Sequence, residues 1–210
     1  MADRNRKILV ATGNPGKIAE IRAMLHADIQ WVSLADFDGL VEIEEDGATF
    51  AENARKKATG YAKATGLWTI ADDSGLMVDA LGGAPGVKSA RFSGDKLTGA
   101  DRTLIDHRNI AKVLALLRDV PKEQRTARFV CCLCLASPQK ILIETEGTLE
   151  GLLTDREMGE HGFGYDPIFF VPRLNKTVAQ LTPDEKNAIS HRGNAIRKLK
   201  DLLEQLSKDT

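Results

Sequence analysis

The chain has 210 residues, of which 42% are hydrophobic and 28% charged, and its formal net charge at pH 7 is −1. These values are ordinary for one globular domain, and a chain of this length buries enough surface to fold without disulfides or a structural metal. The balanced charge and the lack of a Lys/Arg-rich run argue against binding to a long nucleic acid, but they leave room for a pocket that binds one small anion.

The first predicted elements are a short buried strand over Lys7–Thr12 and a helix that follows the turn at residues 12–17. Asn14 suits the N-cap of this helix, and Pro15 suits its first position, where a missing N–H does no harm. A second strand is predicted over Gln30–Leu34. The apolar stripe of the helix consists of Ile18, Ile21, Met24 and Leu25.

Residues 42–46 are acidic, and a second helix is predicted after them. Thr49 and Glu52 have the spacing of a capping box, and Gly66 is placed to end the helix. The apolar face of this helix consists of Phe50, Ala54, Ala58 and Tyr61.

The next predicted strand, Leu67–Ala71, is expected to end where Asp72-Asp-Ser-Gly75 begins, and a glycine-rich loop follows at residues 81–86. Asp101 is placed to cap a long helix that ends near Leu117. The apolar set of that helix consists of Leu104, Ile110, Val113, Leu114 and Leu117.

Two further strands are predicted around Thr126–Ala136 and Lys140–Glu146. The first contains Cys131, Cys132 and Cys134, which we interpret as buried, reduced thiols, because neighbours on one strand form no ordinary disulfide and no second ligand pair suggests zinc. Reduced thiols favour the cytosol. No segment has the length of a membrane span, and the N-terminus lacks a signal-peptide core. We therefore expect a cytoplasmic protein without a membrane partner.

The loop Gly159–Asp166 is predicted to lead into a strand over Ile168–Val171. Thr182 and Glu185 form a second capping box, with Pro183 at the first helical position. Strands and helices alternate early in the chain and strands cluster in its middle, which predicts one α/β domain over residues 1–210 with a mixed sheet. The stripe of the last helix consists of Ile196, Leu199, Leu202, Leu203 and Leu206.

Four groups of residues are candidates for chemistry. The first, Thr12-Gly-Asn-Pro-Gly-Lys17, lies between a strand and a helix, where glycine N–H groups and a helix N-terminus favour an anion. Lys17 adds a full charge, and Thr12 and Asn14 add side-chain donors. The loop is not a Walker A motif, because only two residues separate its glycines. A phosphate-binding loop and a plain strand-to-helix turn both fit this spacing.

The second group is acidic and consists of Glu44, Glu45, Asp72 and Asp73. Mg²⁺ prefers carboxylate oxygens, and the ends of strands are usual places for sites in α/β sheets. In an extended backbone the two aspartates would point to opposite faces, so one of them is expected only to brace the turn. A solvated acidic loop is the alternative interpretation of residues 42–46.

The third group is Gly162–Asp166, whose aromatic rings, flanked by glycines, either face a planar base or pack on the core. The fourth group is formed by Lys186, His191 and Arg192, near a break of the helix expected at Gly193. These side chains either donate to oxygen atoms of a base or a phosphate, or form the cationic end of a surface helix.

Six motifs in this order resemble the inosine/xanthosine triphosphate pyrophosphatase family, and the resemblance extends from Lys7 to about Leu203. The motifs are Ala-Thr-Gly-Asn-x-x-Lys (11–17), Ala-Asp-Asp-Ser-Gly-Leu (71–76), Gly-Gly-Ala-Pro-Gly-Val (82–87), Ser-Ala-Arg (89–91), Gly-Phe-Gly-Tyr-Asp-Pro-Ile-Phe (162–169) and Ser-His-Arg-Gly (190–193). Each motif alone is modest, but all six in order are highly specific.

The resemblance implies a role for each candidate residue. Asp73 would be the catalytic general base and would hold Mg²⁺ together with Glu45, while Asp72 would support them. Ser74 would contact the substrate, and Phe163 would stack on the purine. The triphosphate would be held by Thr12, Gly13, Asn14, Pro15, Gly16, Lys17 and Lys57. The base would be bound by Phe163, Gly164, Tyr165 and Asp166 and read, including its 6-oxygen, by Lys186, His191 and Arg192.

The resemblance also implies an elongated mixed β-sheet flanked by helices, two lobes with the active site in the cleft between them, and a homodimer. The implied activity is Mg²⁺-dependent hydrolysis of ITP, dITP and XTP to the monophosphate and pyrophosphate. His161 departs from the small or amide residue expected beside the base pocket, which leaves the fine specificity open. Three other classes stay open: a phosphatase that releases orthophosphate, a regulator that binds nucleotides without turnover, and a nucleic-acid-binding protein, for which a basic stripe is missing.

Overall fold

The computed structural model describes residues 7–25, 29–94 and 101–206. These residues form two compact units. Unit 1 is built from the described parts of Met1–Asp73, Cys131–Gly147 and His191–Thr210, and unit 2 from those of Ser74–Val130 and Thr148–Ser190. Segments that are far apart in sequence therefore meet within each unit.

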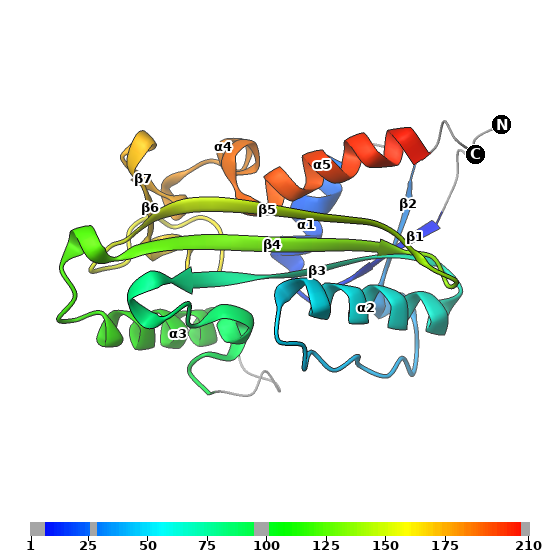
Figure 1. Cartoon of the computed structure of the whole chain (residues 1–210), viewed down its shortest axis with the longest axis horizontal. Helices are drawn as coiled ribbons and strands as arrows, with labels where there is room; N and C mark the ends of the chain where they lie inside the picture. The colour runs from blue at the N-terminus through cyan, green and yellow to red at the C-terminus, as the bar shows by residue number, and fades with distance from the viewer. Residues whose placement is uncertain (1–6, 26–28, 95–100, 207–210) are drawn as a thin grey trace. The chain divides into compact units, whose positions relative to one another are not determined.

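Seven strands form one mixed sheet in the order β2-β1-β3-β4-β5-β6-β7 (Figure 1). Strand β1 pairs in parallel with β2 and β3, whereas β6 pairs antiparallel with β5 and β7. The predicted α/β fold with a mixed sheet is therefore confirmed. The strands are β1 (Lys7–Ala11), β2 (Gln30–Ser33), β3 (Trp68–Val78), β4 (Thr126–Ala136), β5 (Ile141–Leu153), β6 (Phe169–Val171) and β7 (Lys176–Thr177).

The ends of the helices are fixed by the capping residues that the sequence predicts. The side chain of Asn14 accepts hydrogen bonds from the backbone of α1, Thr182 and Glu185 form a capping box at α4, and α2 ends at Gly66 with φ 73°. Thr49 caps α2, but the carboxylate of Glu52 accepts from Ala48 N. The helices are α1 (Pro15–Met24), α2 (Phe50–Thr65), α3 (Arg102–Leu116), α4 (Pro183–Ile189) and α5 (His191–Leu206).

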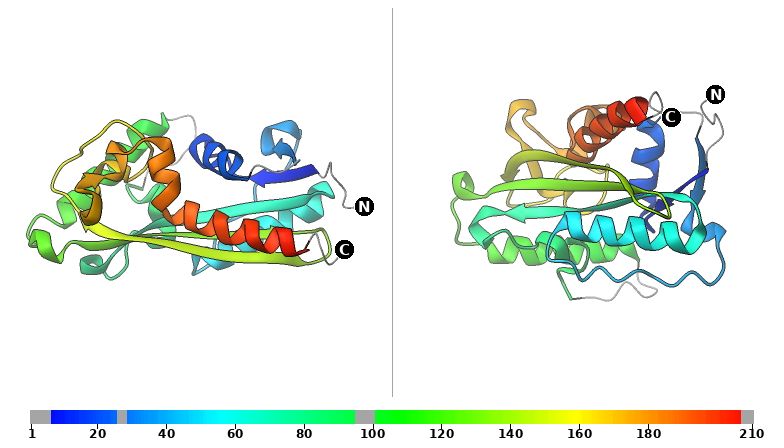
Figure 2. Two further views of the ribbon diagram at one scale, coloured as in Figure 1. Left: turned by 90° about the horizontal axis from the view of Figure 1, so that it is seen from above. Right: turned by 45° about the vertical axis from the view of Figure 1, so that its right-hand side comes forward.

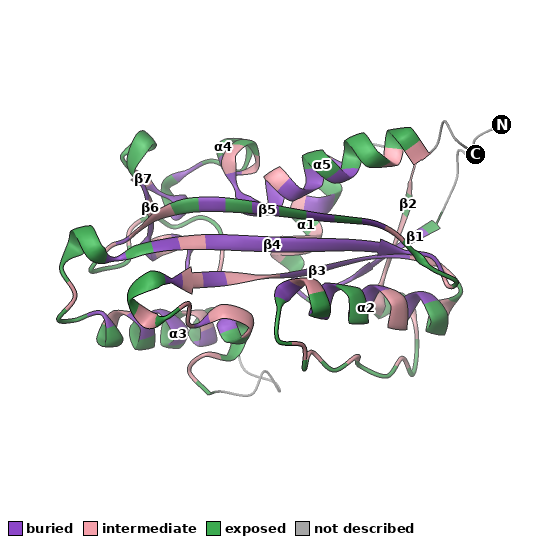
Figure 3. Cartoon of the chain, in the orientation of Figure 1, coloured by how far each residue is buried: buried purple, intermediate pink, exposed green. Residues whose placement is uncertain are grey.

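Unit 1 has its own apolar core, to which β1, α1, β4 and α5 contribute. Helices α1 and α5 lie side by side (Figure 2). Strand β4 is buried along most of its length (Figure 3), and its three cysteines are buried free thiols, as predicted. Strand β5 approaches α5 so closely that a Cβ added to Gly147 would lie 2.5 Å from the Ala195 nitrogen.

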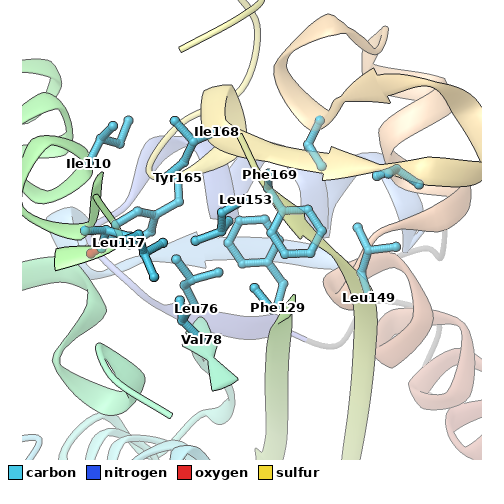
Figure 4. Packing of buried hydrophobic residues seen from close by; sticks show 14 residues of the cluster. Leu76, Val78, Ile110, Leu117, Phe129, Leu149, Leu153, Tyr165, Ile168 and Phe169 are labelled. Carbon is cyan, nitrogen blue, oxygen red and sulfur yellow. The ribbon is translucent and has the colours of Figure 1, made fainter. Parts of the chain in front are cut away.

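Unit 2 has a second core, centred on the rings of Phe129 and Phe169 (Figure 4). The two rings are stacked, with centroids 4.3 Å apart and an interplanar angle of 23°. Helix α3 contributes Ile110 and Val113 to this core. The core therefore joins α3 to the segment that follows the loop at residues 162–166.

Several predicted boundaries were wrong because tertiary pairing overrides local sequence signals. Strand β3 does not end at residue 71 but continues through the two aspartates to Val78, and β5 extends to Leu153. The last helical break lies at Ser190, which has an extended backbone, and not at Gly193. Leu104 and Leu202 were expected on apolar stripes, but they are exposed.

No helix among the described residues is long and apolar enough to cross a membrane. The elongated shape, the two lobes and a cleft between them stay predictions.

Candidate active site

The loop after β1 uses many of its own polar groups to hold its shape. Asn14 Oδ1 accepts from the backbone nitrogens of Gly16 and Lys17 at 2.9 and 3.4 Å, and Thr12 Oγ1 accepts from Asn14 N at 3.2 Å. A Cβ added to Gly13 would meet no atom within 4 Å, so the backbone of that residue borders open space. Pro15 is exposed and begins α1. The loop is thus a rigid turn that presents Lys17 at the start of α1.

Asp72 is the centre of a buried charge network in unit 1. Its Oδ1 accepts from Lys17 Nζ, and its Oδ2 accepts from Arg192 Nε at 2.7 Å. Arg192 Nη1 also lies 2.5 Å from an oxygen of Glu20, and Arg192 is only 1% exposed. Burial by itself would raise the pKa of Asp72, but Arg192 and Lys17 outweigh it and hold the pKa well below its ordinary value.

Cys131 adds a third contact to the same carboxylate, with its Sγ 3.2 Å from Asp72 Oδ2. Burial, together with the negative charge of Asp72, raises the pKa of this thiol well above its ordinary value. The sulfur therefore keeps its proton, and the S–H group donates a hydrogen bond to Asp72.

Asp73 points into a different environment, as expected for neighbours on an extended strand. Its Oδ2 accepts from Asn53 Nδ2 at 3.0 Å, and Lys57 Nζ lies 3.8 Å from its Oδ1. Lys57 Nζ also donates to Glu45 Oε1 at 3.0 Å and to the Asp72 carbonyl at 2.7 Å. Lys57 thereby connects Glu45 to Asp73 and to the backbone of β3.

Burial raises the pKa of the Asp73 carboxyl to about 6, and the nearby charge of Glu45 adds to this effect, while Lys57 and Lys17 oppose it. A carboxyl group with a pKa near neutrality is suited to take up a proton during a reaction. Asp72, held ionised by two cations, is suited to fix those cations in place. The adjacent aspartates thus have different chemical properties.

The residues of this cluster fit a hard divalent cation. Glu45 and Asp73 approach the same ammonium group, which marks a place where positive charge is stabilised. Mg²⁺ is commonly held by one or two carboxylates together with substrate phosphates and waters. Among the residues that the structure describes, no group of three or more His, Cys, Asp or Glu side chains is arranged to hold a metal ion. Two carboxylates therefore suit an ion that shares its coordination with a phosphate-bearing substrate.

Unit 2 gathers five of the predicted base-binding residues into a second cluster, namely Phe163, Gly164, Tyr165, Asp166 and Lys186, whereas His191 and Arg192 belong to unit 1. Lys186 Nζ donates to Asp166 Oδ2 at 2.6 Å and lies 4.4 Å from the centre of the Phe163 ring. Asp166 Oδ2 also accepts from Phe163 N at 3.0 Å, and the hydroxyl of Tyr165 donates to the Ser89 carbonyl at 2.8 Å. Tyr165 packs in the core of unit 2, so its ring supports the loop.

The remaining candidates have different surroundings. Ser74 is half-buried on β3, and His191 is buried at the first position of α5. Glu44 is exposed, unlike Glu45, so the acidic run contains one residue of the cluster and one solvated residue. His161 is exposed, and its backbone N–H donates to the Ala179 carbonyl.

Sequence reasoning missed several residues of these clusters. Asn53 is fully buried, and it connects Asp73 to the backbone of Gly47. The sequence could have indicated Asn53, because its amide lies three residues after Phe50 and four before Lys57, on the apolar face of α2. Glu20 and Cys131 carried no local signal, because their partners are distant in sequence.

These features define an α/β protein with a site of buried lysines and carboxylates, of the kind that takes phosphate-bearing ligands. A model of the Ham1 family matches residues 8–202, and the chain therefore belongs to that family.

Known relatives are similar over almost their whole length. The dITP/XTP pyrophosphatase of Bacillus subtilis is 48% identical over 202 residues, covering 95% of this chain and 98% of the relative. That of Pectobacterium atrosepticum is 49% identical, covering 94% and 98%. A solved Ham1 protein from Coxiella burnetii has a TM-score of 0.83 at 40% identity, covering 95% of this chain and 99% of that one.

Proposed function

We propose that this protein hydrolyses non-standard purine nucleoside triphosphates, namely ITP, dITP and XTP, to the nucleoside monophosphate and pyrophosphate. The observation that carries the proposal is the Lys57 ammonium group between Glu45 and Asp73, beside the Lys17–Asp72 ion pair. The relatives named dITP/XTP pyrophosphatase support the same substrate class. Hydrolysis of such nucleotides would remove them from the nucleotide pool.

The proposed reaction is an in-line displacement at the α-phosphorus. A water oxygen forms a bond to that phosphorus, the bond to the bridging oxygen breaks, and pyrophosphate leaves with the electron pair. Asp73 accepts the proton of the attacking water, for which its raised pKa suits it. Lys17 and Lys57 stabilise the negative charge on the phosphates.

Mg²⁺ is the proposed cofactor, and Glu45 and Asp73 would hold it. When bound, it would stabilise charge on phosphate oxygens and lower the pKa of a bound water. The chain's own part is to keep both carboxylates in place through Asn53 and Lys57. A carboxylate that binds metal loses basicity, so the two tasks of Asp73 need separate tests.

Base recognition is proposed for Phe163, Gly164, Tyr165 and Asp166, with Lys186, His191 and Arg192. Hydrogen-bond donors suit the 6-oxygen of hypoxanthine and xanthine and oppose the 6-amino group of adenine. Lys186, held by Asp166 beside the Phe163 ring, is such a donor. Arg192 is bound by two carboxylates, so its contact with a base stays a prediction.

The resemblance to the inosine/xanthosine triphosphate pyrophosphatase family leads us to propose a homodimer. We propose a cytoplasmic location because the substrates are intracellular nucleotides. Light scattering of the purified chain tests the dimer directly. A mass of one chain would contradict it without affecting the proposed reaction.

The decisive experiment is product analysis with ITP, XTP, GTP and ATP, each with and without Mg²⁺. The proposal expects monophosphate and pyrophosphate from ITP and XTP, and only with the metal. Orthophosphate and diphosphate would overturn the assigned point of attack. Binding without turnover would instead identify a regulator.

Asp73→Asn separates the two tasks of Asp73. The variant keeps the side-chain shape but removes the proton acceptor and one anionic ligand. Titration of Mg²⁺ then distinguishes the tasks, since excess metal restores a lost ligand but not a lost base. Near wild-type turnover at every metal concentration would remove Asp73 from the mechanism.

A further inference from the structure

The helix α3 holds the proposed base-binding loop through a residue with no role so far. The Oδ2 atom of Asp106 accepts a hydrogen bond from the backbone nitrogen of Gly164 at 2.8 Å. Burial raises the pKa of Asp106 above its ordinary value, although the Gly164 N–H lowers it. A carboxylate kept partly out of water in this way makes a strong, directed contact with the amide.

This contact acts on the peptide group between Phe163 and Gly164. The nitrogen of Gly164 belongs to the same rigid peptide plane as the carbonyl of Phe163. That carbonyl accepts from the backbone nitrogen of Asp166 at 3.3 Å. Gly164 has φ 62°, in the left-handed region where glycine has unusual freedom. The Asp106 carboxylate is thus a second hydrogen-bond partner of this peptide group, in addition to the Asp166 N–H.

The other side of the loop is already fixed. Asp166 accepts from both Phe163 N and Lys186 Nζ, and Lys186 faces the Phe163 ring. Helix α3 is itself anchored, because Asn109 Oδ1 accepts from Ser93 N at 2.7 Å. The loop is thus held between Asp166 on one side and Asp106 on the other.

We propose that Asp106 is a positioning residue for base selectivity, which fixes the Phe163–Gly164 peptide so that the Phe163 ring meets the purine. This inference rests on the proposed function. Asp106 belongs neither to the phosphate-binding loop nor to the proposed metal ligands. Its loss therefore weakens binding of the base, which affects KM, and leaves the bond-breaking step intact.

The test compares Asp106→Ala, Asp106→Asn and wild type in steady-state hydrolysis of ITP and GTP. For Asp106→Ala we expect about a tenfold higher KM for ITP, a kcat within about twofold of wild type, and a smaller preference for ITP over GTP. Asp106→Asn keeps an acceptor oxygen at the same place and should restore KM and selectivity. Asp119→Ala, an exposed carboxylate just after α3, is the matched control and should behave as wild type.

Asp106→Ser replaces Asp106→Ala if the alanine variant does not fold, because its hydroxyl is too short to reach the amide. Unchanged KM and selectivity in a folded Ala or Ser variant would overturn the inference. A parallel loss of kcat and thermal stability that Asn does not restore would overturn it too, because it indicates a merely structural role. If wild type itself releases no pyrophosphate from ITP, the proposed function fails instead.

Discussion

The guanidinium group of Arg192 donates from Nε to Asp72 Oδ2 at 2.7 Å, and the side chains of these two residues are 1% and 0% exposed. They are separated by 120 positions in the chain. The pair connects the start of α5 to β3 within unit 1. Asp72 therefore holds Arg192 and Lys17 in place, which agrees with the supporting role that we propose for it beside the proposed base Asp73.

The first prediction concerns the stability of this pair. Asp72→Ala leaves a buried guanidinium with one partner fewer, so the free energy of unfolding should fall by about 3–5 kcal/mol. Urea denaturation measures the change. Asp46→Ala, which removes an exposed ion pair with Lys56, is the control and should have little effect. An equal loss in both variants would show that the buried Asp72 ion pair contributes no more to the free energy of unfolding than an exposed ion pair.

Lys57→Met tests the ammonium group that contacts Glu45 and Asp73. The variant keeps most of the side-chain volume but removes the charge that contacts both carboxylates and that we propose to stabilise phosphate. We expect kcat/KM for ITP to fall by about 100-fold or more. Lys56→Met changes the neighbouring, exposed lysine and should keep wild-type activity. Equal activity of the two variants would exclude Lys57 from the site.

Gly147→Ala tests the close approach of β5 to α5. The added Cβ would collide with the His191 carbonyl and lie 2.5 Å from the Ala195 nitrogen, so backbone must shift. The free energy of unfolding should fall by about 1–3 kcal/mol. In Gly13→Ala the added atom meets nothing within 4 Å, which makes it a matched control for stability. A melting temperature unchanged by Gly147→Ala would show that the two backbones separate at little cost.

We expect the protein to lose stability at alkaline pH because of its buried thiols. Burial raises the pKa values of Cys132 and Cys134 to about 12, above the value of about 8.5 in an unfolded chain. The stability that they contribute is therefore fully present below about pH 8.5 and is lost as the pH rises towards 12.

Melting temperatures at pH 7.5 and 10.5 test this prediction. Between the two pH values, wild type should lose at least about 2 °C more than the double variant Cys132→Ala/Cys134→Ala. The measurement at pH 7.5 corrects for the cavity that the substitutions leave. Equal losses would contradict the prediction.

Local patterns were sufficient where neighbours in sequence are neighbours in space. The cap at Asn14 and the capping box at Thr182 depend on contacts within a few residues, so the sequence predicts them. The buried face of α2 follows from the helical period of its apolar residues, which the sequence also contains. The motifs also predicted which side chains carry chemistry. They did so by resemblance, because spacing alone left a plain turn and a solvated acidic loop open.

Only the tertiary structure decided how those side chains are used. Strand β3 continues through Asp72 and Asp73 because sheet pairing outweighs the local preference of polar residues to end a strand. Because successive side chains of a strand point to opposite faces, Asp72 pairs with Arg192 and Asp73 with Asn53. These partners come from distant segments, and their energies depend on burial and charge, which no local pattern contains.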